Sequence, residues 1–324
     1  MNSILSKAKL GSQPGGRPPV AVELSPQGVL AAASPGPGQP PVYAFEPLPE
    51  GALIPGIGEQ NLRAPEVVAA AIRTALGQVS PRTRAVTLVL PDTVVRVFVL
   101  DFDSLPGRPA EAVSVLRFRL RKMIPFDVEH AGLSYQVLVE DKRECRVLAG
   151  VMPGPILQEY EAAVRQAGYE PGAVLPSSLA ALAAIDSPEP VFAANLGEQA
   201  LTTSITHGQD LLLYRTLDLP EDSSQRLQEV QRGIAVAAAY FEDKIGVRPR
   251  LLHYSGIGGS DHSAPEDFAR WLDDPELAVA DLAPRPETGA ASPLHPTDKD
   301  LSVGTPALGN LSLAGVAGAL AGAA

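Results

Sequence analysis

Hydrophobic positions along the chain follow two spacings, and together they predict alternating strands and helices. Short runs of alternating or continuous apolar residues predict strands at 20–24, 29–33, 85–90, 94–100, 133–140, 146–152, 191–196, 201–207, 211–217 and 250–254. Apolar residues at helical spacing predict helices at 64–76, 109–123, 155–168, 177–185, 223–245, 263–272 and 311–324. This alternation is typical of an α/β protein.

Proline and glycine are concentrated between these elements. The chain contains 32 prolines and 29 glycines, and two proline-rich segments cover residues 35–55 and 284–306. Proline lacks a backbone N–H and fixes φ, so such segments cannot form helices and can form strands only at sheet edges. We therefore expect two long loops flanking an otherwise ordinary core.

Length and composition narrow the class of protein. The 324 residues suggest two domains, and a hydrophobic content of 45% is enough for a core. With 26 basic and 37 acidic residues the net charge is −11, so nucleic-acid binding is not expected. One cysteine and five scattered histidines exclude an intramolecular disulfide and argue against a zinc site. Residues 1–11 lack the apolar run of a secretory signal, and we expect a cytoplasmic protein.

Three local patterns are candidates for chemistry, and each has an ordinary alternative. Residues 255–260 (SGIGGS) follow a predicted strand, where backbone N–H groups could approach a phosphate, or they form a simple tight turn. Their spacing matches neither a P-loop nor a dinucleotide-binding fingerprint. Cys145 lies among charged residues that could lower its pKa, or it is a strand residue without a role. A run of basic residues on the helix at 109–123 could contact an acidic partner or lipid headgroups, or it forms a solvated face: Arg117, Arg119, Arg121 and Lys122.

Several segments, taken in order, resemble the PilM family of actin-like proteins of type IV pilus assembly. The most specific is the run MIPFDVE at 123–129 followed by LSYQVL at 133–138, which is similar to the "IPF…DYQVL" segment of that family. Weaker similarities occur at 160–168, 191–197 (VFAANLG), 229–232 (EVQR) and 254–259 (YSGIGG). The resemblance covers about residues 18–320.

The resemblance implies a two-lobed actin-like (ribonuclease H-like) ATPase fold with a small, family-specific inserted subdomain. Lobe I would cover residues 18–186, with the inserted subdomain at about 82–151. Lobe II would cover 187–306, and a C-terminal helix at 307–324 would return to lobe I. Residues 1–17 would form a disordered tail.

The resemblance also implies a nucleotide cleft between the lobes, with degenerate motifs. The residues that would line this vestigial cleft are Glu23, Ser25, Asn195, Gly197, Arg232, Ser255, Gly256, Gly258 and Gly259. Ser25 stands where the family has glycine, and the following Pro26 has no N–H to offer a phosphate. Asn195 stands where the family has an aspartate that holds Mg²⁺ or its water, and Glu198 would repel a phosphate. We therefore expect ATP with Mg²⁺ to bind weakly or not at all, and we assign no catalytic residue and no metal ligand.

The function implied by the resemblance is that of a cytoplasmic scaffold at the inner face of the bacterial inner membrane. Such a scaffold would bind the short N-terminal cytoplasmic peptide of a PilN-like membrane protein and connect it to pilus motor and platform proteins. Membrane association would then be peripheral, through partners, and self-association remains open. Two alternatives stay open. One is an active actin-like ATPase or sugar-kinase-like enzyme, for which Glu23 could still position a metal. The other is a type II secretion component of the same fold.

Overall fold

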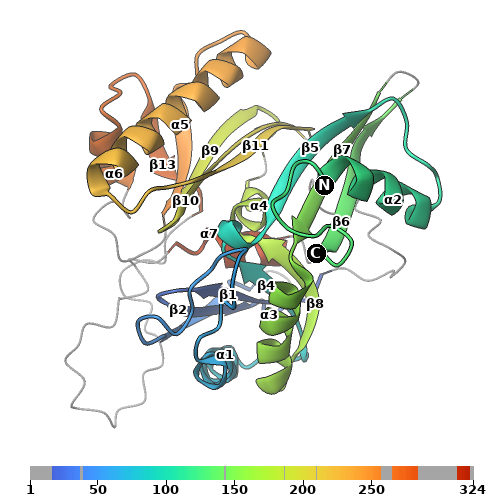
Figure 1. The fold of residues 1–324 in the computed structure, drawn as a ribbon. Coiled ribbons are helices and arrows are strands. Elements are labelled where there is room, and N and C mark those ends of the chain that lie inside the picture. Colours follow the sequence, from blue (N-terminus) through green and yellow to red (C-terminus); the bar gives the residue numbers. More distant parts are fainter. Residues whose placement is uncertain are drawn as a thin grey trace.

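The computed structural model describes residues 17–36, 39–141, 144–185, 187–208, 210–256, 265–283 and 312–321. Within them the chain forms three β-sheets. Figure 1 shows two helix-covered sheets as two lobes, with a smaller sheet beside them. The predicted tail lies almost entirely outside the described residues, and so do Gly258 and Gly259.

The first sheet has the strand order β3-β2-β1-β4-β8. Its strands are β1 (Val20–Ser25), β2 (Gly28–Ala33), β3 (Val42–Pro47), β4 (Ala85–Leu90) and β8 (Glu170–Pro176). The first three strands form an antiparallel meander, whereas β4 and β8 run parallel to β1. Four helices pack on this sheet: α1 (Pro65–Val79), α3 (Gly154–Gln166), α4 (Ser177–Leu182) and α7 (Ala314–Ala321).

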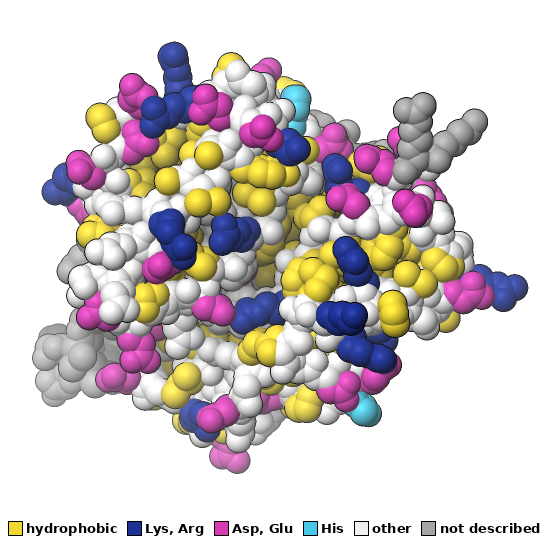
Figure 2. All heavy atoms as spheres, turned by 45° about the horizontal axis from the view of Figure 1, so that its top comes forward, with side chains coloured by type: hydrophobic (Ala, Val, Ile, Leu, Met, Phe, Trp, Pro, Cys, Tyr) yellow, Lys and Arg dark blue, Asp and Glu magenta, His cyan; other side chains and the backbone are white. Residues whose placement is uncertain are grey.

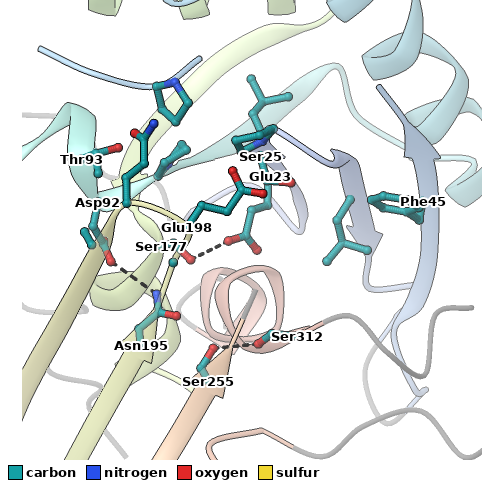
Figure 3. Close-up of a pocket in the computed structure, with 18 residues that line it drawn as sticks. Glu23, Ser25, Phe45, Asp92, Thr93, Ser177, Asn195, Glu198, Ser255 and Ser312 are labelled. Atoms are coloured by element: carbon teal, nitrogen blue, oxygen red, sulfur yellow. Dashed lines mark hydrogen bonds between the residues drawn. The ribbon is translucent and has the colours of Figure 1, made fainter. Parts of the chain in front are cut away.

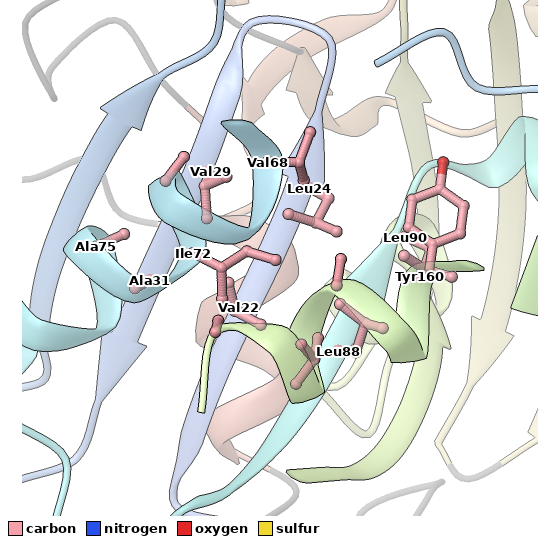
Figure 4. Close-up of a cluster of buried hydrophobic side chains, with 14 of the residues drawn as sticks. Val22, Leu24, Val29, Ala31, Val68, Ile72, Ala75, Leu88, Leu90 and Tyr160 are labelled. Carbon is pink, nitrogen blue, oxygen red and sulfur yellow. The ribbon is translucent and has the colours of Figure 1, made fainter. Parts of the chain in front are cut away.

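The alternation of side chains along β1 decides which residues face which helices. Val22 and Leu24 point into the core under α1 and α3, where they meet Ile72 and Tyr160 (Figure 4). Ala21 points to the opposite face, against α4 and α7. Because side chains two positions apart share a face, Glu23 also points toward α7. The sequence pattern of β1 thus places an acidic side chain between the sheet and a helix.

The second sheet has the order β11-β10-β9-β12-β13, with α5 and α6 on its outer face (Figure 1). Its elements are β9 (Pro190–Leu196), β10 (Ala200–His207), β11 (Asp210–Asp218), α5 (Ser223–Ile245), β12 (Leu251–Gly256), α6 (Pro265–Leu272) and β13 (Ala278–Asp281). An antiparallel meander is again followed by two parallel strands, so the lobes share one topology without a repeat in the sequence. Asp222 begins α5 because its carboxylate accepts the backbone N–H groups of Ser224 and Gln225, at 3.1 and 2.9 Å.

The third sheet is antiparallel, with the order β5-β7-β6, and α2 covers one of its faces. Its elements are β5 (Arg96–Phe102), α2 (Pro109–Leu120), β6 (Gly132–Glu140) and β7 (Cys145–Met152). We expected this inserted unit to begin at about residue 82, which is too early. β4 pairs with β1 and β8 in the first sheet, and the short 3₁₀ helix η1 (Asp92–Val94) makes the connection to β5.

Three strands were missed by the sequence pattern, and all three lie at sheet edges. β3 lies inside the proline-rich segment at 35–55, β8 contains Pro171 and ends at Pro176, and β13 has only four residues. An edge strand pairs on one side only, so a proline there removes no hydrogen bond that the sheet needs. The expected long loop at 35–55 is therefore partly a strand, and most of the second proline-rich segment lies outside the described residues.

Helix α7 lies at the centre of the molecule. It packs against α4 and against β1, β2 and β4 of the first sheet. The approach to α4 is so close that a Cβ on Gly318 would overlap the carbonyl oxygen of Ala180. In the described part of the chain, no helix is long and apolar enough to cross a membrane.

Candidate functional site

A cavity of about 60 Å³ lies between the two lobes, at the tips of the β1–β2 and β9–β10 hairpins (Figure 3). It is lined by Glu23, Leu24, Ser25, Pro26, Leu30, Phe45, Pro55, Pro91, Asp92, Thr93, Ser177, Asn195, Gly197, Glu198, Gln199, Ala200, Ser255 and Ser312. The cavity therefore brings together five residues expected at the vestigial cleft: Glu23, Ser25, Asn195, Gly197 and Ser255. Pockets that hold small ligands usually enclose about 300–1,000 Å³. The space between the described residues is well below that range.

Glu23 is buried against the first turn of α7 and does not project freely into the cavity. The hydroxyl of Ser177 donates a hydrogen bond of 2.5 Å to its Oε1 (Figure 3). Its Oε2 is inaccessible to solvent and has no hydrogen-bond partner in the described structure, although the side chain as a whole is half-buried. A Cβ on Gly315 would lie only 2.5 Å from that oxygen, so glycine is needed there. Burial raises the pKa of Glu23 to about 7, and the nearby charge of Asp92 acts in the same direction.

Asp92 is the acceptor at the centre of a buried network that joins the two lobes. From lobe I, the Ser178 backbone N–H donates to it at 3.0 Å, and the Ser178 hydroxyl donates as well. From lobe II it accepts hydrogen bonds from the side chains of Asn195 (3.3 Å), Thr202 (3.0 Å) and Tyr214 (3.4 Å). Burial raises the pKa of Asp92, while these donors favour its ionised form. No pattern in the sequence marks Asp92 as a site residue.

The network also fixes the role of Asn195. Its amide donates to Asp92 (Figure 3) and, at 2.9 Å, to the Ser178 hydroxyl. Since the amide hydrogens are engaged within the protein, Asn195 acts here as a structural link between the lobes. A carboxylate at this position would face the buried carboxylate of Asp92 and would be repelled by it.

The two hairpin tips are bridged by protein side chains. The Gln27 amide of the first tip donates to the Glu198 carboxylate of the second. Arg226 on α5 donates to the carbonyl oxygens of Gly197, at 2.6 Å, and of Glu198. Ser25 donates to the carbonyl of Gly28 within its own turn, at 3.1 Å. Burial raises the pKa of Glu198, and its attraction to Arg226 opposes this.

The structure does not bring every expected residue to the cavity. Arg232 points away from it and pairs with Glu229 on the exposed side of α5, with 63% of its side chain accessible. Helix α5 does supply an arginine to the second hairpin, but this is Arg226, six residues earlier. Gly256 ends β12 and pairs with Leu196 without lining the cavity. Ser255 does line it, and its hydroxyl lies 2.7 Å from that of Ser312.

The charges around the cavity do not favour a phosphate. Glu23, Asp92 and Glu198 are among the described lining residues, and no lysine or arginine is. Nor do the described residues include a cluster of three or more side chains able to hold a metal ion. A nucleotide would bring further negative charge into a cavity already lined by carboxyl groups.

Two other candidates from the sequence take ordinary roles. Cys145 is buried in β7, and burial raises the pKa of its thiol, so its charged neighbours do not activate it. Arg117 turns back from α2 and donates to the carbonyl oxygens of Val128 and, at 3.1 Å, of Ala131. Arg117 thus hydrogen bonds the segment at residues 128–131, which leads into β6, to helix α2.

Comparison with known proteins identifies the fold. No family model matches the chain, and no curated protein matches it. Among solved structures, a chain of the PilM–PilN type IV pilus biogenesis complex is similar, with a TM-score of 0.68 and 18% identity over 94% of this chain and 98% of that one. The cytoplasmic domain of EpsL, an inner-membrane component of the type II secretion system of Vibrio cholerae, gives a TM-score of 0.47 with 15% identity over 74% and 83%. EutJ, the ethanolamine utilization protein of Carboxydothermus hydrogenoformans, gives 0.46 with 9% identity over 98% and 93%. The chain has the two-lobed actin-like α/β fold of the PilM-type structure over nearly its full length.

Proposed function

We propose that this protein is a cytoplasmic scaffold of a type IV pilus assembly platform, which holds a short peptide of a PilN-like inner-membrane protein and does not hydrolyse ATP. The likeness to a chain of the PilM–PilN complex over nearly the whole length carries the proposal. The residues that line the interlobe cavity support the second part of the proposal, the absence of ATP hydrolysis. Carboxyl groups, a proline turn and bridged hairpin tips occupy the place where an ATPase would hold its phosphates.

A groove beside the smaller sheet fits the proposed peptide. It is open to solvent on one side and offers a space of about 430 Å³. One wall is the loop at residues 57–60, and the other is the start of α3, which directly follows β7. The lining residues are Ile57, Gly58, Glu59, Gln60, Pro153, Pro155, Ile156 and Glu159.

Hydrogen bonds hold the loop wall of this groove in place before any ligand arrives. The side chain of Asn61 accepts the N–H of Gly56 at 3.0 Å and donates to its carbonyl at 2.9 Å. The carboxylate of Glu159 accepts the N–H groups of Asn61 and Leu62, at 3.0 and 2.6 Å. A preformed wall reduces the ordering entropy of binding.

The groove offers mainly apolar contact. Glu159 is engaged with the loop backbone, and Glu59 pairs with Arg63 at 2.7 Å. Gln60 donates to the carbonyl of Leu62 at 3.1 Å, and Ile156 is only 5% accessible because it packs in the core of lobe I. The apolar surface left toward a ligand is that of Ile57 and the rings of Pro153 and Pro155. An extended peptide with apolar side chains fits such a surface, and this mode of recognition recurs among peptide-binding proteins.

Two measurements on the full chain test the proposal. In the first, fluorescence anisotropy follows a labelled N-terminal peptide of a PilN-like protein. We expect Ile57→Glu to weaken binding by at least about tenfold, because it places a charge in an apolar contact. Ile54→Glu is the matched control, since Ile54 is a nearby isoleucine, 44% exposed, that does not line the groove. No binding by the wild type, or equal loss in both variants, would contradict the peptide site.

The second measurement is a thermal-shift titration with Mg-ATP. We expect no stabilisation at micromolar nucleotide. A clear increase in Tm at that concentration would refute the expectation that ATP binds weakly or not at all. Release of inorganic phosphate from Mg-ATP by the same protein would refute the absence of hydrolysis and favour the active-ATPase alternative.

A further inference from the structure

The exposed side of α2 carries the most concentrated positive charge in this acidic protein. Residues 108–123 include five basic side chains and one acidic one, whereas the whole chain has a net charge of −11. Figure 2 shows dark-blue side chains beside yellow ones on the right of the face that it presents, the side on which Figure 1 places α2. We call the surface made by Phe118, Arg119, Arg121, Lys122 and Met123 the α2 patch.

Helix geometry explains why Phe118, Arg121 and Lys122 face outward, while Arg119 and Met123 are exposed beside them at the end of the helix. Leu116 and Leu120 are fully buried against the three-stranded sheet and define the inner side of α2. Phe118 lies about 200° around the helix from Leu116, and therefore on the opposite side. Arg121 and Lys122 follow it at spacings of three and four residues, which places them on the same outer side. The chain keeps helical geometry through Arg121, so this relation holds at the end of the helix.

The apolar members of the patch are unusually exposed. Phe118 is 75% accessible, the highest value among the large hydrophobic residues in the described chain, and Met123 is 44% accessible. Phe118 does not pack into the core cluster beneath α2. Its exposure therefore has no explanation in the packing of the fold.

The cations of the patch are largely available to a ligand. In the described structure neither Arg119 nor Lys122 forms an ion pair, and both are exposed. Arg121 pairs with Glu129 at 2.5 Å, yet 60% of its side chain stays accessible. The remaining neighbouring acid on the helix, Glu111, is engaged by Arg108 at 3.2 Å.

We propose that the α2 patch contacts an anionic lipid surface directly, with Phe118 and Met123 in the headgroup region and Arg119, Arg121 and Lys122 at the lipid phosphates. A lipid surface supplies apolar chains beneath a layer of negative charge, so one ligand matches both halves of the patch. The rest of this acidic protein is repelled by such a surface, and the contact therefore orients the molecule with α2 toward the membrane. The contact goes beyond the proposed function, because it requires no peptide partner.

Vesicle co-sedimentation of the full chain tests this proposal. We expect binding at low salt to vesicles of phosphatidylethanolamine and phosphatidylglycerol, and none to vesicles of phosphatidylcholine alone. Reversing two unpaired charges in R119E/K122E should lower the partition coefficient about 30-fold or more, since each basic residue near such a surface contributes roughly a factor of five. Phe118→Ser should lower it about tenfold through the lost apolar contact.

Matched variants separate a local contact from a general effect of charge. R215E/R250E makes the same change in net charge at exposed arginines of lobe II, and Val247→Ser removes an apolar side chain that is 61% exposed. Both should bind as the wild type does. The proposal is overturned if the wild type fails to bind anionic vesicles at low salt, or if the control variants lose as much binding as the patch variants. Capture of poly-glutamate without any vesicle binding overturns it in favour of an acidic polypeptide partner.

Discussion

Replacing Glu23 with glutamine should change how the stability of this protein depends on pH. Glutamine keeps the shape of the side chain and can still hydrogen bond with Ser177, but it cannot ionise. In the wild type the carboxyl group is buried beside the first turn of α7, and its Oε2 has no hydrogen-bond partner in the described structure. Burial therefore disfavours the charged form in the folded state and not in the unfolded chain.

The sign and size of this pH-dependent change in stability follow from the pKa values of Glu23 in the folded and unfolded states. Folding raises the pKa from 4.5 to about 7, so between these values the folded state binds more protons than the unfolded state. The stability linked to this group is fully present below pH 4.5 and is lost as the pH rises through about 7. At about 1.4 kcal/mol per pKa unit, the whole difference corresponds to about 3 kcal/mol. Because the side chain is only half-buried overall, we expect about 2–3 kcal/mol.

Urea denaturation of both proteins across this pH range measures the effect. At about pH 4 the two should have nearly equal free energies of unfolding, and at about pH 8 Glu23→Gln should be more stable by about 2–3 kcal/mol. Glu242→Gln, at an exposed position of α5, is the control and should follow the wild-type profile. Parallel profiles for the wild type and Glu23→Gln would refute the conclusion that the Glu23 carboxyl is buried and destabilising when charged.

Three further outcomes test other parts of the structure. Asp92→Ala should lower the free energy of unfolding by about 3–5 kcal/mol in urea titrations, because it leaves several buried donors without an acceptor; a loss below about 1 kcal/mol would contradict the interlobe network. Gly318→Ala should reduce stability by about 1–3 kcal/mol, because its Cβ would overlap the Ala180 carbonyl between α7 and α4, and an unchanged Tm would argue against that packing. Cys145, with 1% of its surface accessible, should react with a thiol reagent only after denaturant is added; rapid labelling of the native protein would show that β7 is open.

Local patterns predicted most of the secondary structure correctly. The helix expected at 223–245 is α5 to the residue, because its apolar face repeats at helical spacing and Asp222 marks its start. The strands at 20–24 and 191–196 are β1 and β9 within a residue or two. The missed strands β3, β8 and β13 have no alternating pattern to identify them, since their pairing depends on a neighbouring strand that is already in place.

The cavity was predicted less completely than the elements that form it. Glu23 and Asn195 were assigned from the resemblance to the PilM family, and Ser255 also from the glycine-rich run that follows a predicted strand; all three line the cavity. Arg232 was assigned from a motif alone, and the helical phase of α5 turns it to solvent. Asp92 was missed because its partners Ser178 and Thr202 lie 86 and 110 positions away along the chain.

The sequence by itself determined the elements, the acidic charge and the residue types at the hairpin tips. A proline cannot donate a backbone hydrogen bond and an asparagine carries no charge in any fold, so the expectation of weak phosphate binding rests on Pro26 and Asn195. Only the tertiary structure decided what those residues do instead. It placed α7 over Glu23, joined Asn195 to Asp92 across the lobes, and closed the two tips through Gln27 and Glu198. The physical reason is that elements form from interactions between near neighbours in the sequence, whereas a buried charge is defined by residues that only the packing of the whole chain brings together.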